Sequence, residues 1–230
     1  NGLKVNAEKT QLMVFGSRQN LRGLPDISVN FRGTVLRPCQ QVKNLGVIFD
    51  PCLTWDDHVK SITRKCFGIL IGLNHVGHQL PSDTIVTIVN ALVLSHVRYC
   101  LPVYGNCAKK NHNGMQKILN FAARVISGRR KYDHVADVRD ALGWLSATDL
   151  SSHDTLVFLN RVICTEQPAA IAAMFQRNVT RRERSTRQDN NFSLPSIRTE
   201  TGKRMFGYRA AKMFNELPNE LKDMTSSRFK

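Results

Sequence analysis

Acidic residues are scarce in this chain of 230 residues, in which 18 Asp and Glu stand against 33 Lys and Arg. The net charge of +15 and the isoelectric point near 10.0 favour a polyanionic partner. Residues 1–176 carry +8 and residues 177–230 carry +7. Because the charge is spread along the chain, it predicts a long surface that follows a nucleic-acid backbone, and not a single basic tail.

No apolar run is long enough to cross a membrane. The longest, residues 85–97, is interrupted by Thr87, Asn90, Ser95 and His96 and falls short of the roughly 20 residues that a membrane helix needs. A Gly-x-Ser-x-Gly elbow is also missing, so serine hydrolase chemistry has no support.

The six cysteines form no Cys-x-x-Cys pair, which argues against a structural zinc site and for reduced thiols. We therefore expect no metal in this chain. We also expect an intracellular protein of the nucleus and cytoplasm that is not secreted.

In the first 50 residues, apolar and polar side chains alternate as they do in short β-strands. An apolar strand is predicted at residues 12–15, followed by a strand at 27–31, a tight turn at Arg32-Gly33, a return strand at 34–37 and a further strand at 42–49. This predicts a small β unit.

Helical periodicity takes over at Trp55. Asp56 and Asp57 open an amphipathic helix, where their charges complement the helix dipole. Further helices are predicted from Ser82, as a candidate N-cap, to about residue 98, and then at 112–127, 132–142 and 147–163. We expect the helix at 82–98 to be the buried centre of a bundle, because it is apolar nearly all round.

A polar, basic stretch without apolar period, residues 177–191, predicts a linker or exposed loop. A compact tail should follow, with a hairpin arm containing Phe192, Gly202 at its turn and a helix at 206–214. The predicted fold class is therefore α+β and mostly helical.

Four motifs resemble those of reverse transcriptases of non-LTR (LINE-type) retrotransposons. Residues 2–10 (GLKVNAEKT) and 42–50 (VKNLGVIFD) are similar to the motif that follows the catalytic aspartates and to the Leu-Gly hairpin of the primer grip. Residues 53–59 (LTWDDHV) and 214–218 (FNELP) are similar to downstream markers, although Phe214 stands where Trp is expected. No Tyr-x-Asp-Asp or Ala-Asp-Asp hairpin is present.

The resemblance implies the C-terminal piece of a larger RNA-directed DNA polymerase, which copies its own transcript. It divides the chain into the end of a palm (1–52), a helical thumb (53–130), a helical region (131–176), a basic linker (177–191) and a small hairpin-helix tail (192–230). The implied partners are RNA, RNA–DNA hybrid, a DNA target, and upstream polymerase regions of the same polypeptide, with or without an endonuclease region. Mg²⁺ is expected in the missing upstream core, so this chain alone should be inactive.

By the same resemblance, Lys9 would be an auxiliary catalytic residue near the triphosphate, where its charge would offset charge that develops in phosphoryl transfer. Lys43, Leu45 and Gly46 would approach the primer end. The remaining candidates for nucleic-acid contact are basic side chains on predicted outer faces and loops: Lys60, Arg64, Lys117, Arg124, Arg129, Arg130, Lys131, Arg181, Arg182, Arg184 and Arg187.

Two alternatives stay open. A host-adopted or decayed fragment would be only a nucleic-acid-binding module. A helical protein-interaction scaffold with an incidentally basic surface would bind nucleic acid with little salt dependence.

Overall fold

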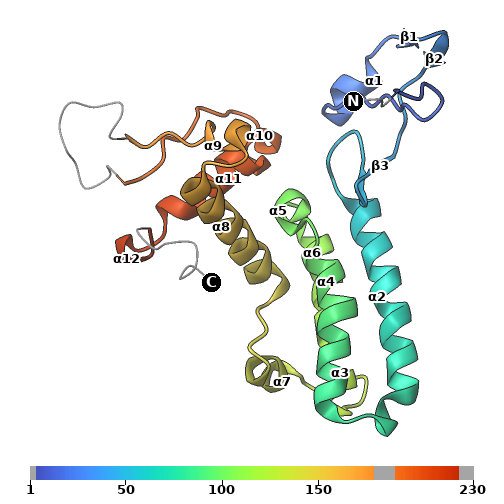
Figure 1. Ribbon diagram of the computed structural model, residues 1–230, viewed down its shortest axis with the longest axis vertical. Helices are drawn as coiled ribbons and strands as arrows, with labels where there is room; N and C mark the ends of the chain where they lie inside the picture. Colours follow the sequence, from blue (N-terminus) through green and yellow to red (C-terminus); the bar gives the residue numbers. More distant parts are fainter. Residues whose placement is uncertain (1–3, 179–189, 223–230) are drawn as a thin grey trace.

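The computed structural model describes residues 4–178 and 190–222. The chain forms an elongated molecule with a helical bundle at one end and the N-terminal β segments at the other (Figure 1). Two small antiparallel hairpins and a majority of helix give the α+β, mostly helical class that the sequence predicts. Within the described ranges, no helix is both long and apolar enough to cross a membrane.

The two hairpins have the same construction. Strands β1 (Val29–Phe31) and β2 (Thr34–Leu36) pair around Arg32-Gly33, and β3 (Val42–Asn44) and β4 (Val47–Phe49) pair around Leu45-Gly46. Both central residues have positive φ in each turn. Such two-residue turns match the natural twist of paired strands, which fixes the register of each hairpin.

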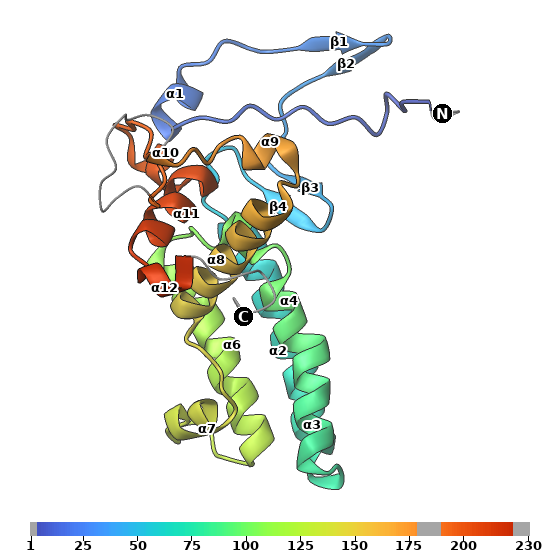
Figure 2. The ribbon, with the colours of Figure 1, turned by 60° about the vertical axis from the view of Figure 1, so that its left-hand side comes forward.

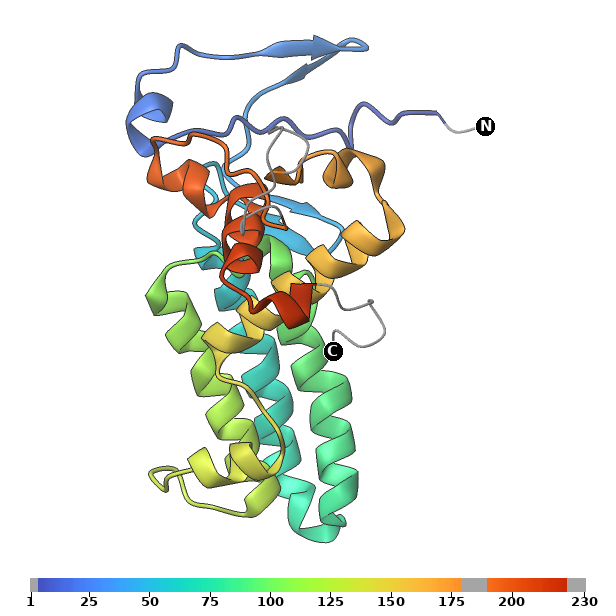
Figure 3. The ribbon, with the colours of Figure 1, turned by 90° about the vertical axis from the view of Figure 1, so that its left-hand side faces the viewer.

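Three helical rods form the bundle. They are α2 (Asp56–Val76), a middle rod built from α3 (Ser82–Val89), η2 (Asn90–Leu94) and α4 (Ser95–Arg98), and α6 (Lys109–Ser127). The short helices η1 (Gly77–Gln79) and α5 (Leu101–Tyr104) connect them. Figure 3 shows α2 and α6 running in the same direction, while the rod that is second in chain order runs back the opposite way, from the end of α2 toward the start of α6.

One apolar core fills the bundle. Each rod contributes residues on one face, and Cys66, Leu70, Val89, Val93, Met115 and Leu119 are fully buried. Tyr104 is also fully buried and donates its hydroxyl to the carbonyl of Val97, so the connection through α5 belongs to the same core. Burial of these side chains supplies the main stabilisation of the bundle.

A second layer crosses the bundle. Helices α7 (Ala136–Ala141), α8 (Ala147–Thr165) and α9 (Ala169–Ala172) follow in the chain, and α8 packs on α5 and α6 (Figure 2). Ser146 caps α8 by accepting from the Asp149 amide, as predicted. At Gly105 a Cβ would overlap Ser151 Oγ, so only glycine allows α8 to approach this closely.

The tail forms a smaller core against the second half of α8. Helices α10 (Glu200–Arg204), α11 (Phe206–Asn215) and α12 (Asn219–Lys222) follow each other, and Leu159, Phe192 and Phe214 are buried together. Asn215 accepts from the Phe192 amide at 2.7 Å and donates to the Phe192 carbonyl at 2.9 Å. The 214–218 motif thus fastens the chain that leads into the tail.

Several predicted elements are corrected in the N-terminal half. Residues 12–15 form no buried strand, because their one ladder contact is an isolated bridge between Leu12 and Pro38. Residues 42–49 are two strands and not one, since Leu45-Gly46 reverses the chain. Helix α3 begins at Ser82 with Pro81 as its N-cap. The middle rod is not buried all round, because its outer face is exposed, with Leu92 at 48%.

The C-terminal half holds two more corrections. The helix predicted at 132–142 is shorter, because the Asp133 carboxylate accepts from the Arg130 amide and holds the preceding residues in a turn. Gly202 lies inside α10 and not at a hairpin turn, because Thr199 caps that helix by accepting from the Gly202 amide.

Candidate nucleic-acid interface

Helices α2 and α6 lie side by side and in parallel, with a constant offset in residue number. Asp56 contacts Lys110 and Asn111 at one end, and Gly114 lies against Val59 further along. The rings of Phe67 and Phe121 then stack with centroids 5.5 Å apart and planes 20° apart. The offset keeps the same two faces in register along both helices. They form one groove, called here the α2–α6 groove.

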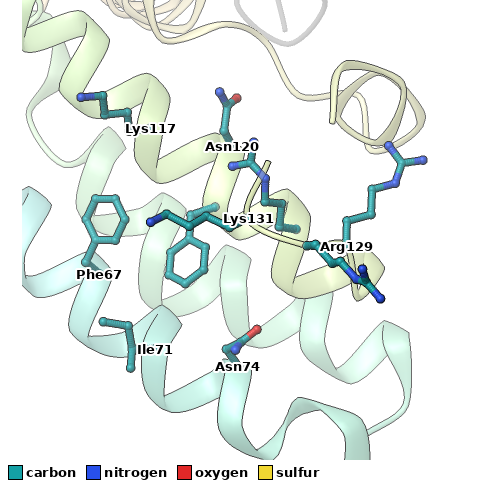
Figure 4. Close-up of a pocket in the computed structure, with 10 residues that line it drawn as sticks. Phe67, Ile71, Asn74, Lys117, Asn120, Arg129 and Lys131 are labelled. Atoms are coloured by element: carbon teal, nitrogen blue, oxygen red, sulfur yellow. The ribbon is translucent and has the colours of Figure 1, made fainter. Parts of the chain in front are cut away.

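A pocket of about 780 Å³ occupies the end of the α2–α6 groove near the Arg129–Lys131 loop. Its walls come from α2, α6 and this loop (Figure 4). The lining residues are Phe67, Ile71, Asn74, Lys117, Asn120, Phe121, Arg124, Arg129, Arg130 and Lys131. Five of the basic residues predicted to contact nucleic acid are therefore brought to one place.

These five basic residues divide into two groups. Arg124 donates to the Asp133 carbonyl at 3.0 and 3.3 Å, and Arg129 donates to both oxygens of Asp137 and to the carbonyl of His134. The hydrogen bonds between Arg129 and Asp137 raise the pKa of the guanidinium and lower the pKa of the carboxyl group. Arg124 and Arg129 therefore hold the loop in place.

The remaining three, Lys117, Arg130 and Lys131, have exposed side chains. None of them pairs with a carboxylate within residues 4–178 and 190–222. Lys131 Nζ lies 5.3 Å from the centre of the Tyr132 ring. Their charges are available to an anionic ligand.

A smaller pocket of about 330 Å³ continues the α2–α6 groove toward the start of both helices, and Lys60 and Arg64 line it. Asp56 is the carboxylate at this end. Burial alone would raise the pKa of Asp56, but hydrogen bonds from Lys110 and Asn111 outweigh it and hold the pKa below its usual value. Lys110 thus offsets the negative charge of Asp56, and Asp56 forms no ion pair with Lys60 or Arg64.

The β3–β4 hairpin presents Leu45 at its tip. Leu45 is 84% exposed and its φ is 44°, an unfavourable backbone conformation for leucine. The Tyr99 hydroxyl donates to the Leu45 carbonyl at 2.8 Å, and a Cβ on Gly46 would lie 3.3 Å from Tyr99 Cε1. The group that lies close to the backbone at Gly46 is therefore the ring of Tyr99. Lys43, on β3, is exposed.

The 53–59 motif joins this hairpin to the α2–α6 groove. The Asp50 carboxylate accepts from the backbone amides of Thr54 and Trp55 at 3.0 and 2.8 Å, which holds the chain between β4 and α2. His58 is buried, and its Nδ1 accepts from the Ile48 amide at 3.3 Å. Trp55 packs edge-on to Phe49. Hairpin and groove are thus fixed relative to each other.

Asp56 and Asp57 lie in the first turn of α2, as predicted for helix-start charges. No group of three or more His, Cys, Asp or Glu side chains in the described part of the chain is arranged to hold a metal ion.

Lys9 lies outside the α2–α6 groove. Lys9 is exposed in a turn where Asn6 Oδ1 accepts from the Glu8 amide and Thr10 donates to the Asn6 carbonyl. This N-terminal segment lies at the opposite end of the molecule from the 780 Å³ pocket (Figure 1). Arg181, Arg182, Arg184 and Arg187 lie outside the described residues.

Sequence reasoning missed the aromatic floor of the pocket and the role of Tyr99. Phe67 follows Cys66, so it stands at the edge of the apolar stripe of α2, where a side chain faces a neighbouring helix. This position could have indicated from the sequence that Phe67 contacts another helix. Nothing in the sequence connects Tyr99 with Leu45, because 54 residues separate them.

Comparison with known proteins finds three that are similar in sequence to this chain. It is 29% identical over 132 residues to a probable RNA-directed DNA polymerase from transposon BS of Drosophila melanogaster. It is 27% and 28% identical over 139 residues to the RNA-directed DNA polymerases from mobile element jockey of Drosophila funebris and Drosophila melanogaster. These matches cover 54–59% of this chain and 14–15% of the relatives.

The chain is thus similar in sequence to polymerases of non-LTR mobile elements, which confirms the resemblance inferred from the motifs. It spans about 15% of the length of these relatives. No family model matches the chain, and the comparison with solved structures found no match.

Proposed function

We propose that this chain is part of the RNA-directed DNA polymerase of a non-LTR retrotransposon and holds the RNA template/DNA primer duplex in its α2–α6 groove. The observation that carries the proposal is a row of basic side chains along this groove that pair with no carboxylate of residues 4–178 and 190–222: Lys60, Arg64, Lys117, Arg130 and Lys131. Helix α2 alone, with 21 residues, gives the groove a length of roughly 30 Å.

Cations in a row suit a ligand that is recognised by its backbone. RNA–DNA hybrids have A-like geometry, which proteins recognise mainly through shape and phosphates. The β3–β4 hairpin would meet the primer end, because it is fixed to the start of α2 by Asp50 and His58. The exposed Leu45, held with positive φ, is the kind of strained residue that occurs at functional sites.

Chemistry would come from outside this chain. The sequence contains no Asp-Asp hairpin of the polymerase type, so the Mg²⁺ ions and their aspartates would be supplied by the parent polypeptide. Lys9 would assist only within that assembly. A host-adopted module would use the same groove, and an upstream coding sequence without the Asp-Asp hairpin would favour it.

The test is the salt dependence of binding to an RNA–DNA hybrid. The groove variant carries Lys60→Ala, Arg64→Ala and Lys117→Ala. Each lost phosphate contact should reduce the slope of log affinity against log salt by about 0.9. Between 1 M and 0.1 M salt, a slope of 0.9 corresponds to an about eightfold change in affinity per contact, so the three lost contacts should remove roughly 500-fold of the gain in affinity over this range.

A matched control removes two lysines and one arginine outside the α2–α6 groove, with Lys65→Ala, Arg161→Ala and Lys212→Ala. All three control residues are exposed. The net charge changes equally in both variants, so only a local groove effect separates them. Equal weakening by both variants would show that overall charge, and not the groove, binds the hybrid.

A further inference from the structure

The 780 Å³ pocket has a feature that a duplex backbone does not use. Phe67 and Phe121, both partly buried, form its apolar floor, and Ile71 beside them is 50% exposed. Phosphate oxygens gain nothing from contact with aromatic rings. A floor of two nearly parallel rings suits a flat, apolar partner that can stack on aromatic side chains.

The rim of the pocket adds polar groups on both sides of this floor. Asn74 belongs to α2 and Asn120 to α6 (Figure 4). Asn120 Oδ1 accepts from Gln116 Nε2 at 2.9 Å, which fixes the orientation of the amide and leaves its N–H groups available. Side-chain amides of asparagine match the donor and acceptor pattern of base edges.

The basic side chains complete the arrangement. Lys117, Arg130 and Lys131 surround the floor at the pocket rim, and Arg124 and Arg129 hold the loop that carries two of them. Aromatic floor, amide groups and cations together match the base, the base edge and the phosphate of one nucleotide. The volume lies in the range of roughly 300–1,000 Å³ that is usual for ligand pockets.

We propose that this pocket receives an unpaired nucleotide of a single strand that continues from the duplex in the α2–α6 groove, with its base stacked on Phe67 and Phe121. A base inside a duplex is already stacked between its neighbours, so only an unpaired base can reach the floor. This inference extends the proposed function, and its test separates the two.

The test compares a blunt RNA–DNA hybrid, the same hybrid with a short single-stranded RNA extension, and the single-stranded RNA alone. Stacking on an aromatic side chain should make the extended hybrid bind about 5- to 150-fold more tightly than the blunt one. With 5-iodouracil in the extension, photocrosslinking should yield peptides that contain Phe67 or Phe121.

The variant for this test is Phe67→Leu with Phe121→Leu, which keeps apolar bulk and removes the rings. It should lose the crosslink and the gain from the extension, and should keep the affinity for the blunt hybrid. Phe15→Leu, which alters a 53% exposed phenylalanine outside the pocket, serves as the control and should change neither. Thermal unfolding of each variant checks that the bundle is intact.

A gain from the extension that survives in the double variant would overturn the inference, and so would crosslinks that map elsewhere or the absence of any gain. If no hybrid binds but single-stranded RNA crosslinks to Phe67 or Phe121, the pocket assignment holds and the proposed duplex function fails. If neither binds, both fail.

Discussion

The contact between Tyr99 and the Leu45-Gly46 turn gives a quantitative prediction. Gly46 has a φ of 85°, and an added Cβ would lie 3.3 Å from Tyr99 Cε1. Gly46→Ala should therefore lower the free energy of unfolding by about 2 kcal/mol, most of it from the left-handed backbone, which costs roughly 1–2 kcal/mol for a residue with a side chain. Tyr99→Phe should cost about 1 kcal/mol through the lost hydrogen bond to the Leu45 carbonyl.

The two contributions can be separated with a double-mutant cycle. Tyr99→Ala removes the ring that the new Cβ would meet, so Gly46→Ala should be about 0.5–1 kcal/mol less destabilising in that background. Thermal unfolding measures each variant, and about 2 kcal/mol corresponds to roughly 4–8 °C in a chain of this size. Additive effects would refute the close contact.

The functional part of this prediction concerns the full-length polymerase to which we propose that the chain belongs. If the hairpin meets the primer end, Gly46→Ala should depress primer extension much more than it weakens affinity for the hybrid. Equal losses of extension and affinity, or a loss of extension fully explained by unfolding, would reduce the Leu45-Gly46 turn to a packing feature.

Three further predictions concern activity, pH and the tail. The isolated chain should incorporate no nucleotide on any primer-template with Mg²⁺ or Mn²⁺, and extension above a heat-killed control would contradict the assignment. Burial lowers the pKa of His58 below 6.5, so its contribution to stability is complete above about pH 6.5 and is lost as the pH falls. His58→Asn keeps an acceptor for the Ile48 amide, so it should show a smaller loss of stability between about pH 7 and 5, whereas identical pH profiles would exclude a role for this imidazole. Asn215→Ala should cost about 2 kcal/mol in the free energy of unfolding, because it leaves both backbone groups of Phe192 without partners, and an unchanged melting temperature would refute this.

The helical part of the fold could be predicted well from the sequence, because helix signals are local. A few neighbouring residues are enough to indicate each of three features: the apolar stripe of α2, the cap at Ser146 and the end of α6 at Gly128. The hairpin turn at Arg32-Gly33 was predicted for the same reason.

The errors arose where tertiary contacts decide the structure. A buried strand was predicted at residues 12–15. An apolar run forms a strand only where a neighbouring strand supplies hydrogen bonds, and here Leu12 pairs with Pro38 alone. The middle rod was predicted to be buried on all sides because its sequence is apolar nearly all round. Composition cannot show which of its faces a neighbouring helix covers.

The candidate site was predictable only as a set of basic residues. Helical spacing placed Lys60, Arg64 and Lys117 on outer faces, but it could not show that α2 and α6 are parallel and turn these faces into one groove. Nor could it separate Arg129, which Asp137 holds, from Lys131, whose charge is available. Such distinctions depend on contacts between segments far apart in the chain.

The central claim, that the α2–α6 groove holds a nucleic-acid duplex, is tested most directly by lysine footprinting. Acetylation of the chain alone and in complex with an RNA–DNA hybrid compares groove lysines with exposed lysines elsewhere. We expect Lys60, Lys117 and Lys131 to be protected by the hybrid while Lys65 and Lys212 react as before. Protection of Lys65 and Lys212 with Lys60 and Lys117 unchanged would contradict the account.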